Sequence, residues 1–82
     1  MKTVILTHKA AKQLDALPST VRQSIHAALT AYALMGQGDV RQLSGRDGYR
    51  LRVGKYRVIF AEDAVTILAI YIGRRSTTTY NQ

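Results

Sequence analysis

The sequence contains no cysteine and no tryptophan, only one proline, and only five acidic residues among its 82. Without cysteine the chain has no disulfide framework, no thiolate nucleophile and no cysteine-based metal site. Its apolar runs are much shorter than a membrane span, and the opening segment MKTVILTHKAAKQ lacks the apolar core and cleavage site of a signal peptide. We therefore expect a cytoplasmic protein with no membrane segment.

A length of 82 residues fits one domain, so we expect residues 1–82 to fold as a single unit. At 46% hydrophobic residues, the chain is too apolar for a disordered tail. The core of so small a domain is only marginally sufficient. A protein partner that covers exposed apolar surface would therefore suit this chain.

Basic residues outnumber acidic ones by twelve to five, which gives a formal net charge of +7. The excess lies in residues 41–82, which carry eight basic side chains, seven of them arginine, and three acidic ones. A basic surface points to phosphate groups or to an acidic protein. Arginine in particular suits bidentate phosphate recognition because its guanidinium is a planar fork. The alternative is a solvated surface with no specific ligand.

The first half of the chain predicts one strand followed by two helices. Residues 2–6 are rich in β-formers, Thr7 offers a capping hydroxyl, and apolar residues recur at helical spacing over 10–17. Pro18 ends that helix and suits the first turn of the next. An apolar stripe then runs from Val21 to Tyr32, and Gly36 and Gly38 end the second helix. We expect a helical hairpin that is amphipathic in both arms.

The second half predicts strands. Residues 49–60, YRLRVGKYRVIF, alternate on both sides of Gly54-Lys55, which favours a hairpin with a two-residue type II′ turn. A polar loop precedes it, with a short extended piece at 40–43, and the apolar run 65–72 is typical of a strand covered on both faces. We therefore expect an α+β fold: an N-terminal strand, a helical hairpin and a three-stranded antiparallel sheet segment, with the helices packed on one sheet face.

The hairpin register places arginines on one face. With Gly54 and Lys55 as the turn centre, Arg52 lies opposite Arg57, and Arg50 shares their face. Like charges directly opposite one another are unfavourable, and no carboxylate nearby in the sequence relieves them, so a polyanionic ligand is the better explanation. The alternative is a solvated face on which arginine stems cover apolar surface. The other face must pack on the helices and carries Tyr49, Leu51, Val53, Tyr56, Val58 and Phe60.

The C-terminal segment can complete this arginine face. Arg74 and Arg75 follow the apolar strand, and they reach the same region if that strand is central in the sheet. Tyr80 could fold back over the arginines as a stacking surface or a hydroxyl donor. Alternatively, Tyr80 is a frayed terminal residue without a specific role.

The segment Leu43-Ser44-Gly45, the hairpin from Tyr49 to Phe60 and the segment from Ile70 to Arg75 resemble the RelE/ParE toxin superfamily of type II toxin–antitoxin systems. The resemblance spans nearly the whole chain and implies a RelE-like fold. RelE-like members cleave messenger RNA in the ribosomal A site, whereas ParE-like members poison DNA gyrase. The RelE-like pattern implies a catalytic set at Arg50, Arg52, Arg57, Arg75 and Tyr80, with further RNA contacts from Arg46, Lys55 and Arg74.

This full set favours the ribonuclease branch, although two positions depart from the pattern. Both basic positions of the first hairpin strand are arginine, where the RelE pattern commonly has lysine. The spacing from Gly73 to Tyr80 is also one residue shorter than the pattern. The resemblance implies cleavage without a metal or other cofactor, because the ribose 2′-OH attacks the adjacent phosphate.

The arginines cannot provide the general base that this reaction needs. Arginine stays protonated in proteins, so the arginines can stabilise charge but cannot readily accept a proton. Tyr80, with a pKa shifted by neighbouring cations, is the best candidate. His8 and His26 titrate in a suitable range, but both fall in the helical half, where surface positions explain them.

The sequence is compatible with three functions from different classes. The leading hypothesis is a ribosome-dependent mRNA endoribonuclease, which binds the ribosome and mRNA. The second is a DNA gyrase inhibitor that uses the same scaffold without chemistry, and the third is a module whose arginines only bind. The resemblance also implies a cognate antitoxin, acidic in its toxin-binding segment, that wraps the sheet or the helical hairpin.

Overall fold

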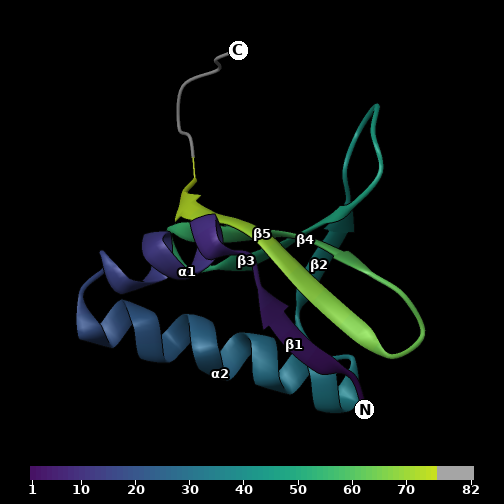
Figure 1. Ribbon diagram of the computed structural model, residues 1–82, viewed down its shortest axis with the longest axis horizontal. Coiled ribbons are helices and arrows are strands. Elements are labelled where there is room, and N and C mark those ends of the chain that lie inside the picture. Colours follow the sequence, from purple (N-terminus) through teal and green to yellow (C-terminus); the bar gives the residue numbers. More distant parts are fainter. Residues whose placement is uncertain (76–82) are drawn as a thin grey trace.

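The computed structural model describes residues 1–75, and these form a mixed sheet with two helices (Figure 1). The strands follow the order β1-β5-β4-β3-β2, with β1 parallel to β5 and the other neighbours antiparallel. No helix in this part of the chain is long and apolar enough to cross a membrane. The elements are β1 Thr3–Leu6, α1 His8–Asp15, α2 Ser19–Met35, β2 Asp39–Gln42, β3 Tyr49–Val53, β4 Tyr56–Glu62 and β5 Thr66–Arg74.

This architecture confirms the expected α+β fold and adds one strand to the expected sheet. The segment predicted only as a short extended piece forms β2, which pairs with β3 at the sheet edge. The antiparallel part of the sheet therefore has four strands, β5-β4-β3-β2, rather than three. The hairpin itself has the expected register, with Val53 opposite Tyr56, and Gly54 supplies the positive φ (+58°) that its turn requires.

The helix ends follow from local sequence. The Thr7 hydroxyl oxygen accepts a hydrogen bond from the Ala10 N–H at 3.1 Å and caps α1 as expected. Pro18 occupies the N-cap of α2 and not its first turn. Gly36 closes α2 in the left-handed region (φ +69°), which glycine adopts without a Cβ penalty.

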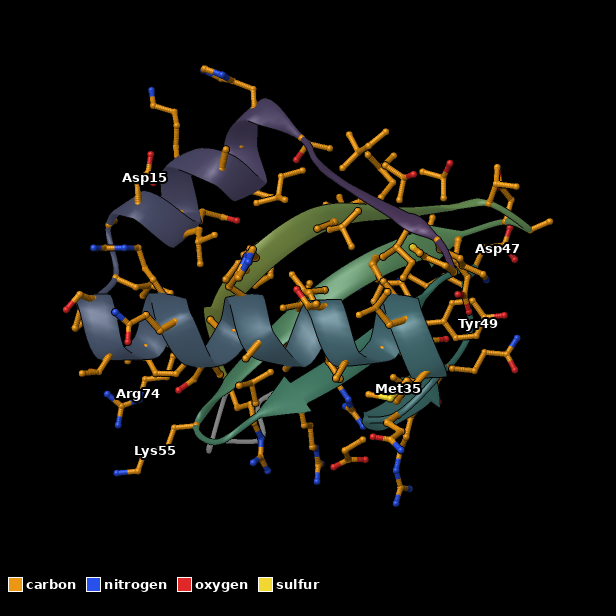
Figure 2. All side chains as sticks on the ribbon, turned by 90° about the horizontal axis from the view of Figure 1, so that it is seen from below. Asp15, Met35, Asp47, Tyr49, Lys55 and Arg74 are labelled. Atoms are coloured by element: carbon orange, nitrogen blue, oxygen red, sulfur yellow. The ribbon has the colours of Figure 1, made fainter. Side chains whose placement is uncertain are left out.

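The core lies between the sheet and the two helices. Side chains from β3, β4 and β5 meet one face of α2, which crosses the sheet in Figure 2. The expected alternation holds, since Leu51, Val58 and Phe60 are at most 1% exposed while Tyr49, Val53 and Tyr56 pack around them. Each Å² of apolar surface that is buried contributes about 25 cal/mol to the free energy of folding, so this cluster is the main favourable term in folding. The buried set is Ala10, Ile25, Leu29, Ala33, Leu51, Val58, Phe60, Ile67, Ala69 and Ile72.

The strand β5 is covered on one face only, which corrects the expectation of cover on both. Ile67 and Ala69 are fully buried, but Leu68 and Ile70 are 36% and 41% exposed. Because both helices pack on the same side, the outer face of β5 faces solvent among the residues described. The register between β4 and β5 shifts at Ile59/Phe60, so the bulge leaves Ile70 without a partner residue in β4.

The helix α1 completes the edge of β5 beyond the end of β1. The Thr7 N–H donates to the Ala69 carbonyl at 2.9 Å, and the Ile72 N–H donates to Gln13 Oε1 at 2.8 Å. These contacts satisfy backbone groups that the short strand β1 cannot reach. They hold the C-terminal half of β5, which Arg75 directly follows.

Candidate nucleic-acid interface

Five arginines lie on the outer face of the sheet, opposite the helices. Arg41 pairs with Arg50 across β2 and β3, and Arg52 pairs with Arg57 across β3 and β4. Residues directly opposite one another in antiparallel strands share a face, with Cβ atoms about 5 Å apart. Arg75 follows β5 and completes the set. We call Arg41, Arg50, Arg52, Arg57 and Arg75 the arginine cluster.

The hairpin turn holds Arg75 in place. Its N–H donates to the Lys55 carbonyl at 2.7 Å, and its Nη1 donates to the Gly54 carbonyl at 3.0 Å. Charge from Arg75 also reaches Arg50 and contributes to the lowering of its pKa. The residue after β5 is therefore tied to the β3–β4 turn by both its backbone and its side chain.

The electrostatics of the cluster oppose folding. Burial, followed by repulsion from the other four members, lowers the pKa of Arg50 below its ordinary value. The Nε atoms of Arg50, Arg52 and Arg57 are all buried and have no hydrogen-bond partner among the residues described. A buried donor without a partner costs about 1–3 kcal/mol. No contact among the described residues offsets this cost, whereas an anionic ligand could accept hydrogen bonds from these Nε atoms.

One carboxylate enters the cluster from β2, a strand that is distant from the hairpin in the sequence. Asp39 in β2 pairs in register with Arg52, although its carboxylate lies nearest to Arg41, with Oδ1 3.9 Å from Nε. Both partners are more than half exposed, and an exposed pair of this kind contributes little. The cluster therefore keeps a strong positive charge.

The structure brings together four of the expected site residues and separates others. Arg50, Arg52, Arg57 and Arg75 share the outer face. Arg74 pairs with Tyr56, whose side chain packs on the core, so Arg74 lies on the helical side. Figure 2 shows Arg74 and Lys55 at the hairpin end of the molecule.

The other expected residues lie at the border of the cluster or beyond the described chain. Arg46 is exposed in the loop 43–48, beside Arg57, and Lys55 is exposed in the hairpin turn. Tyr80 lies outside the described residues. His8 and His26 are exposed on α1 and α2, as their surface interpretation requires.

Two residues of the outer face were not identified from the sequence. Arg41 reaches the cluster only because β2 pairs with β3, and the polar loop between these strands hides their register. Tyr71 pairs with Ile59, and its ring centroid lies 5.9 Å from Cζ of Arg57. The uninterrupted apolar run around Tyr71 gives no alternation from which its face could be read.

This arrangement can bind phosphate and stabilise developing negative charge. Guanidinium forks from three strands and from the segment after β5 converge on one surface, so several of them can contact the same phosphate group. None of these side chains can serve as a general base, because arginine stays protonated. The arginine cluster could therefore position an anionic ligand and stabilise its charge, but it could not supply a general base.

Comparison with known proteins agrees with this geometry. Residues 4–77 match the sequence model of the "ParE toxin of type II toxin-antitoxin system, parDE". A search of curated proteins found no significant match. The fold is similar to that of RelE from the archaeal RelE–RelB complex of Pyrococcus horikoshii OT3, with 23% identity, a TM-score of 0.79 and coverage of 94% of this chain and 98% of that one.

Two further solved structures have the same fold. The isolated Escherichia coli RelE toxin has a TM-score of 0.79 at 20% identity, with 96% of this chain and 89% of that one covered. A chain of the intact E. coli RelBE toxin–antitoxin complex has a TM-score of 0.74 at 23% identity, with coverage of 93% and 99%. These likenesses show a RelE-like fold and confirm the resemblance drawn from the sequence. With a family match over nearly its whole length, the chain belongs to the ParE toxin family of type II toxin–antitoxin systems.

Proposed function

We propose that this toxin is a ribosome-dependent mRNA endoribonuclease that inhibits translation in the cytoplasm. The observation that carries the proposal is the convergence of Arg50, Arg52, Arg57 and Arg75 on one face, with three Nε atoms that have no partner among the described residues. Folding gains nothing from this arrangement, but a phosphate in an RNA strand would satisfy it. The RelE-like fold supports the same activity.

The proposed reaction is an internal transfer at phosphorus. The ribose 2′-oxygen forms a bond to the adjacent phosphorus while the bond from phosphorus to the 5′-oxygen breaks. The products are a 2′,3′-cyclic phosphate and a free 5′-OH. A base takes the 2′-OH proton, and an acid returns a proton to the leaving 5′-oxygen.

The arginine cluster contributes positioning and charge stabilisation to this reaction. Guanidinium groups hold the scissile phosphate in line and stabilise the extra negative charge of the phosphorane. Loss of one such donor typically lowers the rate by roughly 10²–10³. Tyr80, which lies outside the described residues, is the proposed general base, since the arginines cannot accept the proton and a cation beside a tyrosine favours the phenolate.

The proposed partners are an antitoxin, the ribosome and mRNA. Solved structures from P. horikoshii and E. coli include complexes of RelE with RelB. We infer that this toxin binds a cognate antitoxin, acidic where it meets the arginine cluster, because such a segment would neutralise the net charge of +7.

Primer extension on mRNA in a translating extract tests the proposal. The wild-type protein is expected to produce discrete new 5′ ends within codons, and these should disappear when ribosomes are removed. Arg57→Ala should lower cleavage by roughly 10²–10³. Lys12→Ala is the matched control, since Lys12 is an exposed cation on α1, outside the arginine cluster. Equal cleavage by Arg57→Ala and wild type would overturn the site assignment.

The ParE family match favours a second candidate, a DNA gyrase inhibitor that uses the same surface without chemistry. A gyrase supercoiling assay separates the two functions. Inhibition of supercoiling, with no new mRNA 5′ ends in the extract, would replace the first proposal with the second. The arginine cluster would then be a binding surface only.

A further inference from the structure

The outer face carries an open hollow beside the arginine cluster. The proposed cleavage chemistry assigns no role to this hollow as a whole. Its apolar lining, which we call its floor, comprises Leu43, Ile59 and Ile70. Arg57 borders the hollow and also belongs to the cluster, so a ligand in the hollow would lie next to a bound phosphate. The remaining lining residues are Arg46, Asp47 and Tyr71.

The position of Tyr71 depends on two features of β5. Ala69 and Ile72 both face the core, and the bulge adds Ile70 between them as an extra residue without a partner in β4, so Tyr71 is turned to the outer face. The phenol ring then lies across Gly73, where a Cβ atom would come within 2.7 Å of Cζ of Tyr71. A side chain at position 73 would therefore displace the ring, and glycine keeps the aromatic surface in place.

The surroundings of the ring are cationic. Nζ of Lys9 in α1 and Cζ of Arg57 in β4 both lie 5.9 Å from the Tyr71 ring centroid. An aromatic surface between positive charges suits a nucleotide, whose base stacks while its phosphate is attracted. A purely apolar ligand would gain nothing from these charges.

A closed loop holds the polar side of the hollow. The Leu43 N–H donates to the Gly48 carbonyl at 3.0 Å and closes the segment that carries Arg46 and Asp47. Gly48 has a φ of +117°, and a Cβ there would lie 3.3 Å from the Phe60 carbonyl, so the loop approaches β4 closely. Figure 1 shows this loop rising from the sheet on the side away from α2, which places it on the outer face.

We propose that this hollow binds a nucleobase of the RNA strand whose phosphate the arginine cluster holds. The base stacks on Tyr71 over the apolar floor, and Asp47 accepts a hydrogen bond from its exocyclic amino group. Uracil is disfavoured because it has no exocyclic amino group. Its N3–H lies between two carbonyl oxygens, and these oxygens would be repelled by the Asp47 carboxylate. This inference rests on the proposed function, RNA cleavage, and adds to the protein a site that selects the base of the RNA substrate.

The absence of tryptophan from the chain makes a direct binding test possible. Tyr71→Trp introduces a single tryptophan into the hollow, and its fluorescence reports base stacking. The probe is a single-stranded RNA oligonucleotide at about 50 mM salt, where phosphate contacts are strong. The matched control is Tyr56→Trp, because Tyr56 lies on β4, next to β5, and faces the helical side of the sheet. Circular dichroism verifies that both variants are folded.

RNA is expected to quench Tyr71→Trp and to leave Tyr56→Trp unchanged. In the wild-type background, Tyr71→Ala should weaken RNA binding about tenfold, whereas Tyr71→Phe keeps the stacking surface and should bind normally. Equal quenching in both tryptophan variants, or none in either, would overturn the proposal. Quenching by an antitoxin peptide but not by RNA would also overturn it and assign the hollow to a protein partner.

Base preference and cleavage separate this proposal from the proposed function. CMP should quench Tyr71→Trp more strongly than UMP, and Asp47→Ala should remove that difference. If CMP and UMP quench equally, Asp47 does not read the base. Normal cleavage by Tyr71→Ala would reject the base site while the ribonuclease stands. Quenching by RNA without cleavage by the wild type would reject the ribonuclease while the base site stands.

Discussion

Removal of one arginine from the cluster should stabilise the fold, and Arg50→Met is the sharpest case. Arg50 has a buried Nε without a partner among the described residues, and Arg41 lies directly opposite. Methionine keeps an unbranched stem of similar length, so the packing over the sheet is largely preserved. Only the charge and the unpaired donor are lost.

The expected gain follows from these two contributions. An unpaired buried donor costs about 1–3 kcal/mol, and a like-charged pair directly opposite costs roughly 0.2–1 kcal/mol. Since the ends of the guanidinium can still be solvated, we expect a net gain of about 1–2 kcal/mol in the free energy of unfolding. For a chain of this size that corresponds to a rise in Tm of about 5–10 °C.

Urea unfolding followed by circular dichroism measures the effect. Because arginine stays charged in proteins, the gain should be present at every accessible pH. It should shrink as salt screens the repulsion from Arg41. Arg22→Met is the control: its Nη1 donates to the Leu17 carbonyl at 2.6 Å, so this variant should lose stability. If Arg50→Met is less stable than wild type with an unchanged m-value, the cluster contributes to folding and the reasoning fails.

Three other predictions concern groups that hold the fold together. Burial, with the hydrogen bond to Glu62, raises the pKa of Tyr32 to about 12. The contribution of Tyr32 to folding stability should therefore be complete below pH 10 and be lost between pH 10 and about 12. Tyrosinate absorbance can follow this titration. Burial alone would raise the pKa of Glu62, but hydrogen bonds from Lys2 and Tyr32 outweigh it and lower the pKa. Stability should therefore fall as pH drops below about 4.5, and Glu62→Gln should flatten that acid limb of the unfolding curve; an equally steep limb in the variant would contradict this. Gln13→Ala leaves the Ile72 N–H without its acceptor and should cost about 1–3 kcal/mol in urea unfolding, whereas no loss would mean that water replaces the amide.

Much of the fold and part of the site could be predicted from the sequence, because short-range rules decide them. The alternation on both sides of Gly54-Lys55 determined the hairpin register, since a slip of one residue would bury the arginines and expose Leu51. Arg52 therefore had to lie opposite Arg57. The cap at Thr7 and the stop at Gly36 likewise depend on one residue and its immediate neighbours.

Only the tertiary structure decided which further residues join the arginine face. Arg41 enters because β2 pairs with β3 across a loop whose length and register no local pattern specifies. Tyr71 is turned outward by a bulge within an apolar run that shows no alternation. The same pairing sends Arg74 to the helical side and Arg75 to the cluster, although the two are adjacent. Strand pairing sets these positions through long-range hydrogen bonds, and the identity of each residue does not reveal which partner strand it will meet.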